Sequence, residues 1–320
     1  MAQREEGEMN TSSWYSRISL IGVLSITTML LCGSAFAADH VSGQVLGAGA
    51  PIARSTVVLW EASASAPKKL AETKTNDEGR FEISDDGARG DTVLYLIATG
   101  GVPKANKGGD ENPALVLLAM LGNKPPEKVV VNELTTVASA FTAAQFINGD
   151  SISGNPLGLR IAAGNAPNLV DPATGGWGKV LLDPLNSTQT TTLANLNTLG
   201  SLISAFAAVA NDDWRTRFLK AATQTGGTTP KNTLEAMAGI ARAPWANAST
   251  LYALFDEAYP QPQNALLRRK APFAPYLAYT PKDFALSLCF SGGGNYSAGR
   301  LMFDAEGNLW SGRCRPRPCQ

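Results

Sequence analysis

The sequence contains a single histidine, His40, and this scarcity excludes several kinds of active site. Catalytic triads, cysteine–histidine pairs and multi-histidine zinc sites all need histidine held in a formed pocket. His40 lies near the N-terminal end of the part expected to fold, where a chain is usually mobile. Most familiar hydrolase mechanisms are therefore excluded, and no catalytic residue is predicted.

Neither sign of charge is in excess. Lysine and arginine together number 27, and aspartate and glutamate together also number 27. A basic surplus attracts nucleic acid and an acidic surplus holds cations, so neither partner is expected. No calcium-loop spacing appears among the acidic residues, and no metal or other cofactor is predicted.

Several acidic residues are adjacent in sequence, but this spacing is not that of a catalytic pair of carboxylates. Neighbours in sequence point in different directions on a helix or a strand, so such pairs do not form a glycosidase-like couple by themselves. We interpret them as helix caps and solvated faces: Asp85 with Asp86, Asp212 with Asp213, and Asp256 with Glu257.

Cysteine is also sparse, with four in the whole chain. Cys289 lies in an apolar stretch, while Cys314 and Cys319 lie close to the C-terminus. This number does not make a disulfide framework. Cys314 and Cys319 can bridge each other in an oxidising compartment, or remain two thiols of an unstructured tail.

Long apolar runs are absent except near the N-terminus. Residues 18–32 have the length of the apolar part of a signal peptide and are short for a membrane span, and Ala35-Phe36-Ala37 supplies a cleavage pattern. Residues 1–37 are therefore predicted to be a signal peptide cleaved after Ala37. Met9 is an alternative start, which would leave Arg17 as the only charge before the apolar run. We expect a periplasmic or extracellular protein that meets a membrane only through the uncleaved leader.

Residues 38–101 are predicted to form a β-sandwich. Short runs of β-branched and aromatic residues alternate with Gly, Pro, Asn and Asp clusters, at residues 40–46, 56–60, 80–83 and 92–97. Residues 75–81 form a turn that feeds a strand, and Gly79 supplies the positive φ that such a turn needs.

The order of the motifs in this region resembles the carboxypeptidase regulatory-like domain, a transthyretin-like sandwich. The matching features are Val41-Ser42-Gly43-Gln44-Val45, the turn Pro51-Ile52-Ala53, the strand that ends in Trp60, and the turn at residues 75–81. The resemblance implies an accessory folding or adhesion module without a catalytic site.

A connector rich in Gly, Lys and Pro is predicted at residues 102–129, and a helical domain at residues 130–259. Asn132 can cap a helix whose apolar face contains Leu134, Val137, Ala138 and Phe141. Further helices are predicted at residues 191–209, 214–222, 234–242 and 251–258. In the helix predicted at residues 191–209, Asn195, Thr198 and Ser201 lie opposite an apolar stripe. Residues 164–168 are predicted to be a loop because they are rich in turn-forming residues.

The C-terminal region is predicted to be a linker followed by part of a repeat. Residues 260–282 are rich in proline and form the linker, and residues 283–312 form an incomplete β-propeller blade with a strand at residues 285–290. Apolar strands around an Asp304-x-x-Gly307-Asn308 turn make its hairpin. A cut near Pro281 is then expected to leave the melting of the preceding domains almost unchanged.

The helical region resembles exported bacterial proteins in which such a region precedes an NHL-type propeller. Three sequence segments carry the resemblance: residues 131–139, 163–171 and 232–242. That propeller is similar to streptogramin (virginiamycin B) lyase, and the likeness runs from about residue 40 to Gly312. No position here matches the lyase's catalytic segment, so the resemblance carries over no site residue. Residues 313–320 lack apolar alternation, and we hypothesise an aberrant tail caused by a frameshift or premature stop at the start of the propeller.

The expected fold class is therefore multidomain α+β, with an N-terminal β-sandwich, a central all-α domain and a C-terminal fragment of a propeller blade. The expected function is that of an exported, non-catalytic binding or scaffolding protein, a truncated relative of NHL-type propeller proteins. Its ligand is unidentified, with a cell-surface polysaccharide or a protein as the expected class. The alternative is a lyase or glycan-active enzyme that is inactive without its propeller.

Overall fold

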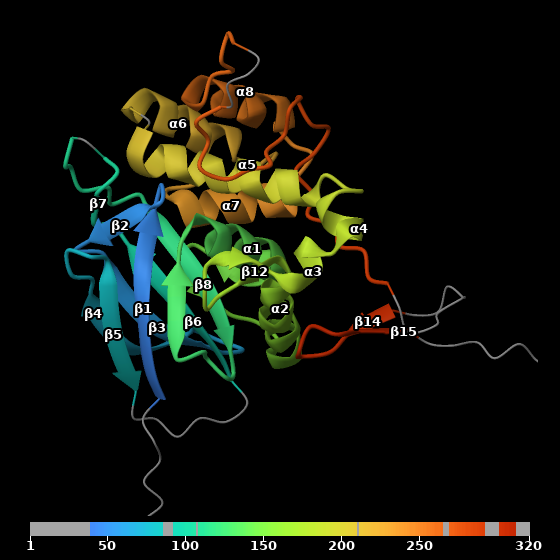
Figure 1. Ribbon diagram of the computed structural model, residues 1–320. Coiled ribbons are helices and arrows are strands. Elements are labelled where there is room, and N and C mark those ends of the chain that lie inside the picture. Colours follow the sequence, from blue (N-terminus) through green and yellow to red (C-terminus); the bar gives the residue numbers. More distant parts are fainter. Residues whose placement is uncertain are drawn as a thin grey trace, which may run out of the picture. The chain divides into compact units, whose positions relative to one another are not determined.

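The computed structural model describes residues 39–85, 92–106, 108–209, 211–264, 269–291 and 301–311. In this part of the chain the fold is mixed α and β, with several antiparallel sheets and eight α-helices (Figure 1). The coarser part of the fold prediction, a mixture of helices and antiparallel sheets, is confirmed. The predicted leader at residues 1–37 and the predicted tail at residues 313–320 lie outside the described residues.

The first sheet is built around one long strand, β1. Its neighbours run antiparallel, except for β9, which pairs with β1 in parallel over Ser42 to Val45. The order is β5-β1-β2-β7, with β9 beside β1, and the bounds are β1 (Asp39–Gly47), β2 (Ala50–Ala53), β5 (Arg80–Asp85), β7 (Val102–Pro103) and β9 (Lys128–Val131).

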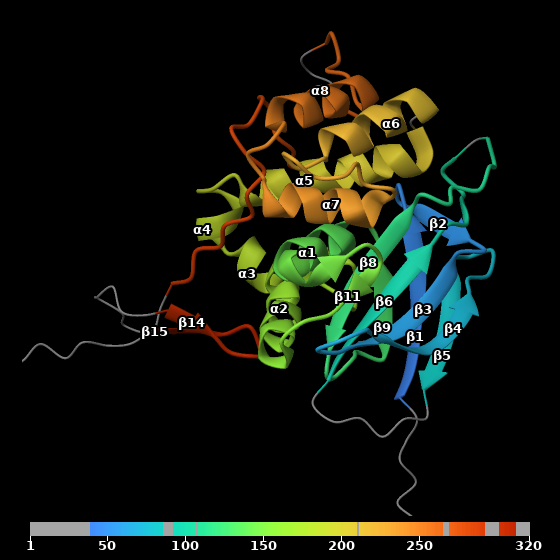
Figure 2. The same cartoon turned by 180° about the vertical axis from the view of Figure 1, so that it is seen from behind.

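The second sheet is antiparallel throughout and packs face to face with the first (Figures 1 and 2). Its order is β4 (Lys68–Lys74), β3 (Thr56–Ala62), β6 (Val93–Thr99) and β8 (Val116–Gly122). β6 and β8 each bury six consecutive residues, because the first sheet covers one face and helices cover the other. All four predicted strand runs are confirmed.

The predicted connector at residues 102–129 is wrong, because β7, β8 and the first half of β9 fall within it. The run Val116-Leu117-Leu118-Ala119-Met120-Leu121 is apolar on both faces and does not alternate. A strand buried on both faces has no polar side, so it carries no period of two. The Gly, Lys and Pro residues on either side are the turns that connect these strands.

Three helices cover the second sheet. α1 (Glu133–Ala143), α2 (Pro156–Leu169) and α7 (Thr233–Arg242) contact β8, and α2 also contacts β6 (Figure 2). The sheets and helices share one apolar core that extends from Val41 to Phe284. The described residues accordingly form one compact unit.

The remaining helices form a layer beyond α1. α5 packs on α1 and continues into a π-helical turn, and α8 contacts both α5 and α6. The bounds are α3 (Lys179–Leu182), α4 (Pro184–Ser187), α5 (Thr192–Ser204), the π-turn (Ala205–Val209), α6 (Asp212–Ala221) and α8 (Ala248–Ala258). The predicted helices are confirmed, and Asn132 caps α1 as expected.

α2 replaces the loop that was predicted at residues 164–168. Asn155 caps it, Pro156 opens it, and its buried residues repeat with helical spacing at Leu159, Ala162, Ala163, Ala166 and Leu169. The prediction was wrong because Gly, Asn and Pro were weighted above this apolar period. Pro167 lies in the last turn of α2 and lacks the N–H that would bond to the carbonyl of Ala163.

The predicted linker at residues 260–282 packs against the helices. Leu277 is 7% exposed, and its N–H donates to Thr198 Oγ1 at 3.0 Å. Asn197 Nδ2 donates to the carbonyl of Pro275 at 2.8 Å. Polar side chains of α5 thus provide hydrogen-bond partners for backbone N–H and C=O groups of this segment, which lies outside any helix or sheet.

Residues 285–290 are not a strand of a sheet, contrary to the prediction. Side chains of α4 and α5 hold their backbone instead: Asn195 Nδ2 donates to the carbonyl of Ala285 at 2.9 Å, and Thr192 Oγ1 donates to that of Ser287 at 2.5 Å. Asn186 accepts from the N–H of Cys289 at 2.6 Å and donates to its carbonyl at 2.9 Å. Buried helix side chains therefore take the place of a neighbouring strand.

Asn186→Ala is expected to cost about 1–3 kcal/mol of unfolding free energy, since it leaves partly buried backbone groups of Val180 and Cys289 without partners. The side chain is fully buried and also donates to the carbonyl of Val180 at 2.9 Å. Urea unfolding measures the cost, and amide exchange of Cys289 should become faster. An unchanged exchange rate at Cys289 would contradict the assigned contact.

The predicted hairpin is confirmed as β14 (Leu301–Phe303) paired with β15 (Leu309–Ser311). Asp304 organises its turn and accepts from the indole N–H of Trp310 at 2.7 Å and from the backbone N–H of Asn308 at 2.8 Å. The Trp310 bond is the largest cause that lowers the pKa of Asp304 to about 2. Asn168 Nδ2 donates to the carbonyl of Gly307 at 3.0 Å, which fixes the turn on α2.

Candidate functional site

The chemistry-bearing residues singled out from the sequence do not come together. His40 is exposed and lies 4.0 Å from the carboxylate of Glu82. In the part of the chain that is described, no group of three or more His, Cys, Asp or Glu side chains is placed to hold a metal ion. Asp86 lies outside the described residues.

The acidic pairs of the helices make ion pairs with arginine. Arg217 binds Asp213 at 2.8 Å and both oxygens of Glu257 at 2.8 and 2.7 Å, which holds the pKa of Glu257 below its usual value. Asp212 pairs with Arg215 at 3.1 Å, and Asp256 pairs with Arg269. These carboxylates are therefore occupied by structural contacts.

Within the part of the chain that the structure describes, the tryptophans at positions 177, 214, 245 and 310 do not form one stacking platform. Trp214 is buried and stacks on Phe218 with ring centroids 5.5 Å apart, while the half-buried Trp177 donates its indole N–H to Asn197 at 2.8 Å. Trp245 and Trp310 are 69% and 63% exposed and belong to different parts of the fold. Trp214 thus belongs to the apolar core, and Trp177 packs against it.

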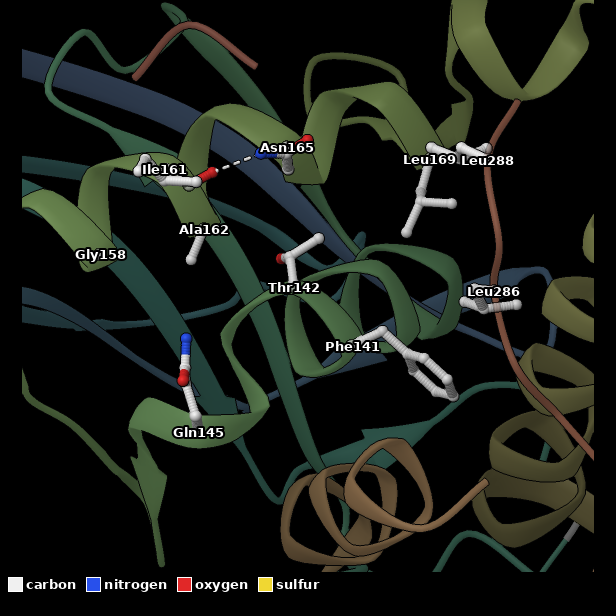
Figure 3. Close-up of a pocket in the computed structure, with 10 residues that line it drawn as sticks. All are labelled: Phe141, Thr142, Gln145, Gly158, Ile161, Ala162, Asn165, Leu169, Leu286 and Leu288. Carbon is white, nitrogen blue, oxygen red and sulfur yellow. Dashed lines mark hydrogen bonds between the residues drawn. The ribbon is translucent and has the colours of Figure 1, made fainter. Parts of the chain in front are cut away.

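A groove of about 380 Å³ lies between α1, α2 and the extended segment at residues 285–290 (Figure 3). It brings together chain segments more than a hundred residues apart. Its walls are formed by Phe141, Thr142, Gln145, Gly158, Ile161, Ala162, Asn165, Leu169, Leu286 and Leu288.

The helical spacing of α2 builds one wall of this groove. Gly158, Ile161, Ala162, Asn165 and Leu169 recur at intervals of three and four residues, so they share one face. Glycine and alanine leave room there that larger side chains would fill. At Gly158 an added Cβ would lie 2.7 Å from the ring of Phe146, so a larger residue would require that ring to shift.

The polar side chains of the groove are amides and a hydroxyl. Asn165 Nδ2 donates to the carbonyl of Ile161 at 2.8 Å, the dashed line of Figure 3, and Thr142 Oγ1 donates to that of Ala138 at 3.0 Å. Gln145 is exposed at the mouth. None of the lining residues is acidic, basic, a thiol or a phenol. The groove can therefore bind apolar surface and make uncharged hydrogen bonds, but it supplies no acid or base for catalysis.

A second, larger hollow of about 650 Å³ lies where the first sheet meets strand β4 of the second. Lys74, Arg80, Glu82 and Lys128 are among the side chains around it. They belong to the exposed outer faces of β4, β5 and β9, where charged residues are ordinary. We therefore take the apolar groove as the better candidate, although it is smaller.

One buried carboxyl group lies outside both hollows. Glu133 is 1% exposed, accepts from Ser204 Oγ at 2.6 Å and from the N–H of Ala48, and has its pKa raised by burial. The hydrogen bonds oppose this shift without cancelling it. Glu133 joins the turn after β1 to the end of α5, so its role is structural.

Comparisons with known proteins do not place the chain in a family. No family model and no curated protein matches it. Among solved structures, a 9R-lipoxygenase from Cyanothece PCC8801 is 18% identical over 29% of this chain and 15% of that chain, with a TM-score of 0.21. A likeness at this TM-score does not show a shared fold. Among the described helices, none has the length and apolar character needed to cross a membrane.

Sequence reasoning did not find the groove. Its α2 wall falls partly in the stretch read as a loop, and Leu286 and Leu288 fall in a stretch read as a strand of a blade. The spacing of Leu159, Ala162, Ala166 and Leu169 was the signal that would have revealed α2. No local signal brings residues 285–290 beside that helix.

Proposed function

We propose that this is an exported, non-catalytic binding or scaffolding protein and that the groove between α1, α2 and residues 285–290 is its binding site. The observation that carries the proposal is the lining, which is apolar apart from uncharged amide and hydroxyl groups. Burial of apolar surface contributes about 25 cal/mol per Å², and ligand pockets are mostly lined in this way. The alternative of a lyase or glycan-active enzyme requires acid and base groups that this groove lacks.

The apolar walls favour a protein partner over a cell-surface polysaccharide. Sugars are bound through many polar groups and exposed aromatic faces, whereas only Phe141 is aromatic among the lining side chains. The proposed periplasmic or extracellular location follows from the leader expected at residues 1–37, and a partner is expected in the same compartment.

The sequence resemblance supports a further part of this proposal, that the chain is a relative of NHL-type propeller proteins. The sandwich, the helical region and the hairpin then correspond to three ancestral modules. An isolated two-stranded hairpin is marginally stable, and Leu301, Met302 and Trp310 are 64%, 68% and 63% exposed. These side chains are available for the next strands of a propeller blade.

Ile161→Lys is expected to abolish binding of a neutral apolar probe, Nile red, because the charge would have to be desolvated in the groove. The wild-type protein should enhance the fluorescence of the dye in a saturable titration. Leu157→Lys is the matched control: Leu157 lies one turn earlier on α2, is 54% exposed and does not line the groove.

The control should bind the dye with wild-type affinity, and circular dichroism should show that both variants are folded. A wild-type protein that does not bind Nile red, or an Ile161→Lys variant that binds it as well as the control does, would refute the groove as the binding site.

A further inference from the structure

Residues 285–290 have the alternation of a β-strand although they belong to no sheet. The carbonyls of Ala285, Ser287 and Cys289 all accept hydrogen bonds from α4 and α5. Leu286 and Leu288 are half-buried and line the groove, whereas Ser287 and Cys289 are exposed. Both patterns repeat every second residue, as in an extended chain.

The opposite edge of this segment is free. Within the described residues, the N–H and C=O groups of Leu286 and Leu288 have no hydrogen-bond partner. Backbone groups of successive residues in an extended chain point to opposite edges. Since the carbonyls of Ala285, Ser287 and Cys289 face α4 and α5, the backbone groups of Leu286 and Leu288 lie on the edge away from those helices. A strand added at that edge would direct every second side chain to the face on which Leu286 and Leu288 line the groove (Figure 3).

We propose that the groove binds an extended, uncharged peptide, which adds as a strand to the free edge of residues 285–290. The peptide backbone hydrogen-bonds to Leu286 and Leu288, and every second peptide side chain enters the apolar space between Phe141 and Leu169. This inference rests on the proposed function, because it names the ligand class of the same groove.

Two features of the groove favour a peptide over other apolar ligands. A lipid chain or an aromatic molecule fills the groove but leaves the backbone groups of Leu286 and Leu288 unpaired, whereas a peptide strand pairs them at its own repeat of about 3.3 Å per residue. The lining also carries no charge, so a peptide with charged side chains would lose their hydration without gaining an ion pair. Alternating apolar and small polar residues match both requirements.

The test uses the wild-type protein and a capped peptide of about six residues in which threonine and valine alternate. A series of such peptides carries one N-methyl group each, at successive positions, and displacement of Nile red measures their affinities. N-methylation removes one backbone donor. We expect a loss of about tenfold at every second position and little change between, since only alternate N–H groups face Leu286 and Leu288.

The outcomes separate this inference from the proposed function. Equal effects at all positions, or a peptide that does not displace a dye that does bind, would overturn strand addition and leave the binding groove intact. A protein that binds neither dye nor peptide would overturn both. Binding of the unmodified peptide that survives Ile161→Lys as well as Leu157→Lys would place it outside the groove and also overturn the inference.

Discussion

Phe284→Ala is expected to lower the free energy of unfolding by about 3–5 kcal/mol, the range for truncating a fully buried phenylalanine. Phe284 has no exposed surface and belongs to the common core, and its N–H donates to the carbonyl of Pro244 at 2.9 Å. Urea unfolding followed by circular dichroism measures the loss. Tyr279→Ala is the matched control, because Tyr279 lies in the same segment and is 84% exposed.

The control should change stability by less than about 0.5 kcal/mol. Equal stability of the two variants would show that the segment is not part of the core. The sequence predicted that a cut near Pro281 would leave the melting temperature of the preceding domains almost unchanged, and the packing of Phe284 predicts the opposite. Such a cut removes Phe284, Leu286 and Leu288, so it should lower the melting temperature by several degrees or more.

Glu133→Gln is expected to remove a decline of stability with rising pH. Burial raises the pKa of Glu133 in the fold, so the folded protein binds its proton more tightly than the unfolded chain does. The resulting stabilisation is fully present below the ordinary pKa of glutamate and is lost as pH rises through the raised value. Within that window the wild type should lose about 1.4 kcal/mol for each pH unit relative to the variant.

Glutamine suits this comparison because its carbonyl oxygen can still accept from Ser204 and from the N–H of Ala48. Glu257 and Asp304 have lowered pKa values and act in the opposite direction, but both proteins share them. Urea unfolding at a series of pH values gives the difference directly. Parallel stability curves for the two proteins would mean that Glu133 does not titrate abnormally.

Much of the fold could be predicted where the pattern along the chain is local. The strands at residues 40–46 and 56–60 alternate or are rich in β-branched residues, and Asn132 caps the helix that follows it. The Asp304 turn also revealed its hairpin, because a side chain that accepts several N–H groups within a few residues is a local device.

What could not be predicted depends on contacts between distant parts of the chain. β8 is apolar on both faces because α1 and the first sheet enclose it, so it lacks the alternation that marks a strand. Residues 260–282 contain enough prolines to suggest a free linker, yet Asn197 and Thr198 of α5 hold them. The sequence of that helix does not indicate whether its polar side chains bind water or the backbone of another segment.

The groove was missed for the same reason. Phe141, Ile161 and Leu288 come from three separate stretches of sequence, and none of them carries a catalytic or ligand-binding motif. One feature of the groove agrees with the sequence analysis, which predicted no catalytic residue: its lining contains no charged side chain.

Amide hydrogen exchange at Leu286 and Leu288, measured by NMR with and without the threonine–valine peptide, tests the binding edge most directly. Both amides lack a partner in the described structure, so strand addition should slow their exchange by about tenfold or more, while that of Ser287 stays as it was. Saturating peptide that leaves the exchange of Leu286 and Leu288 unchanged would contradict the assignment of this edge and groove as the peptide-binding site.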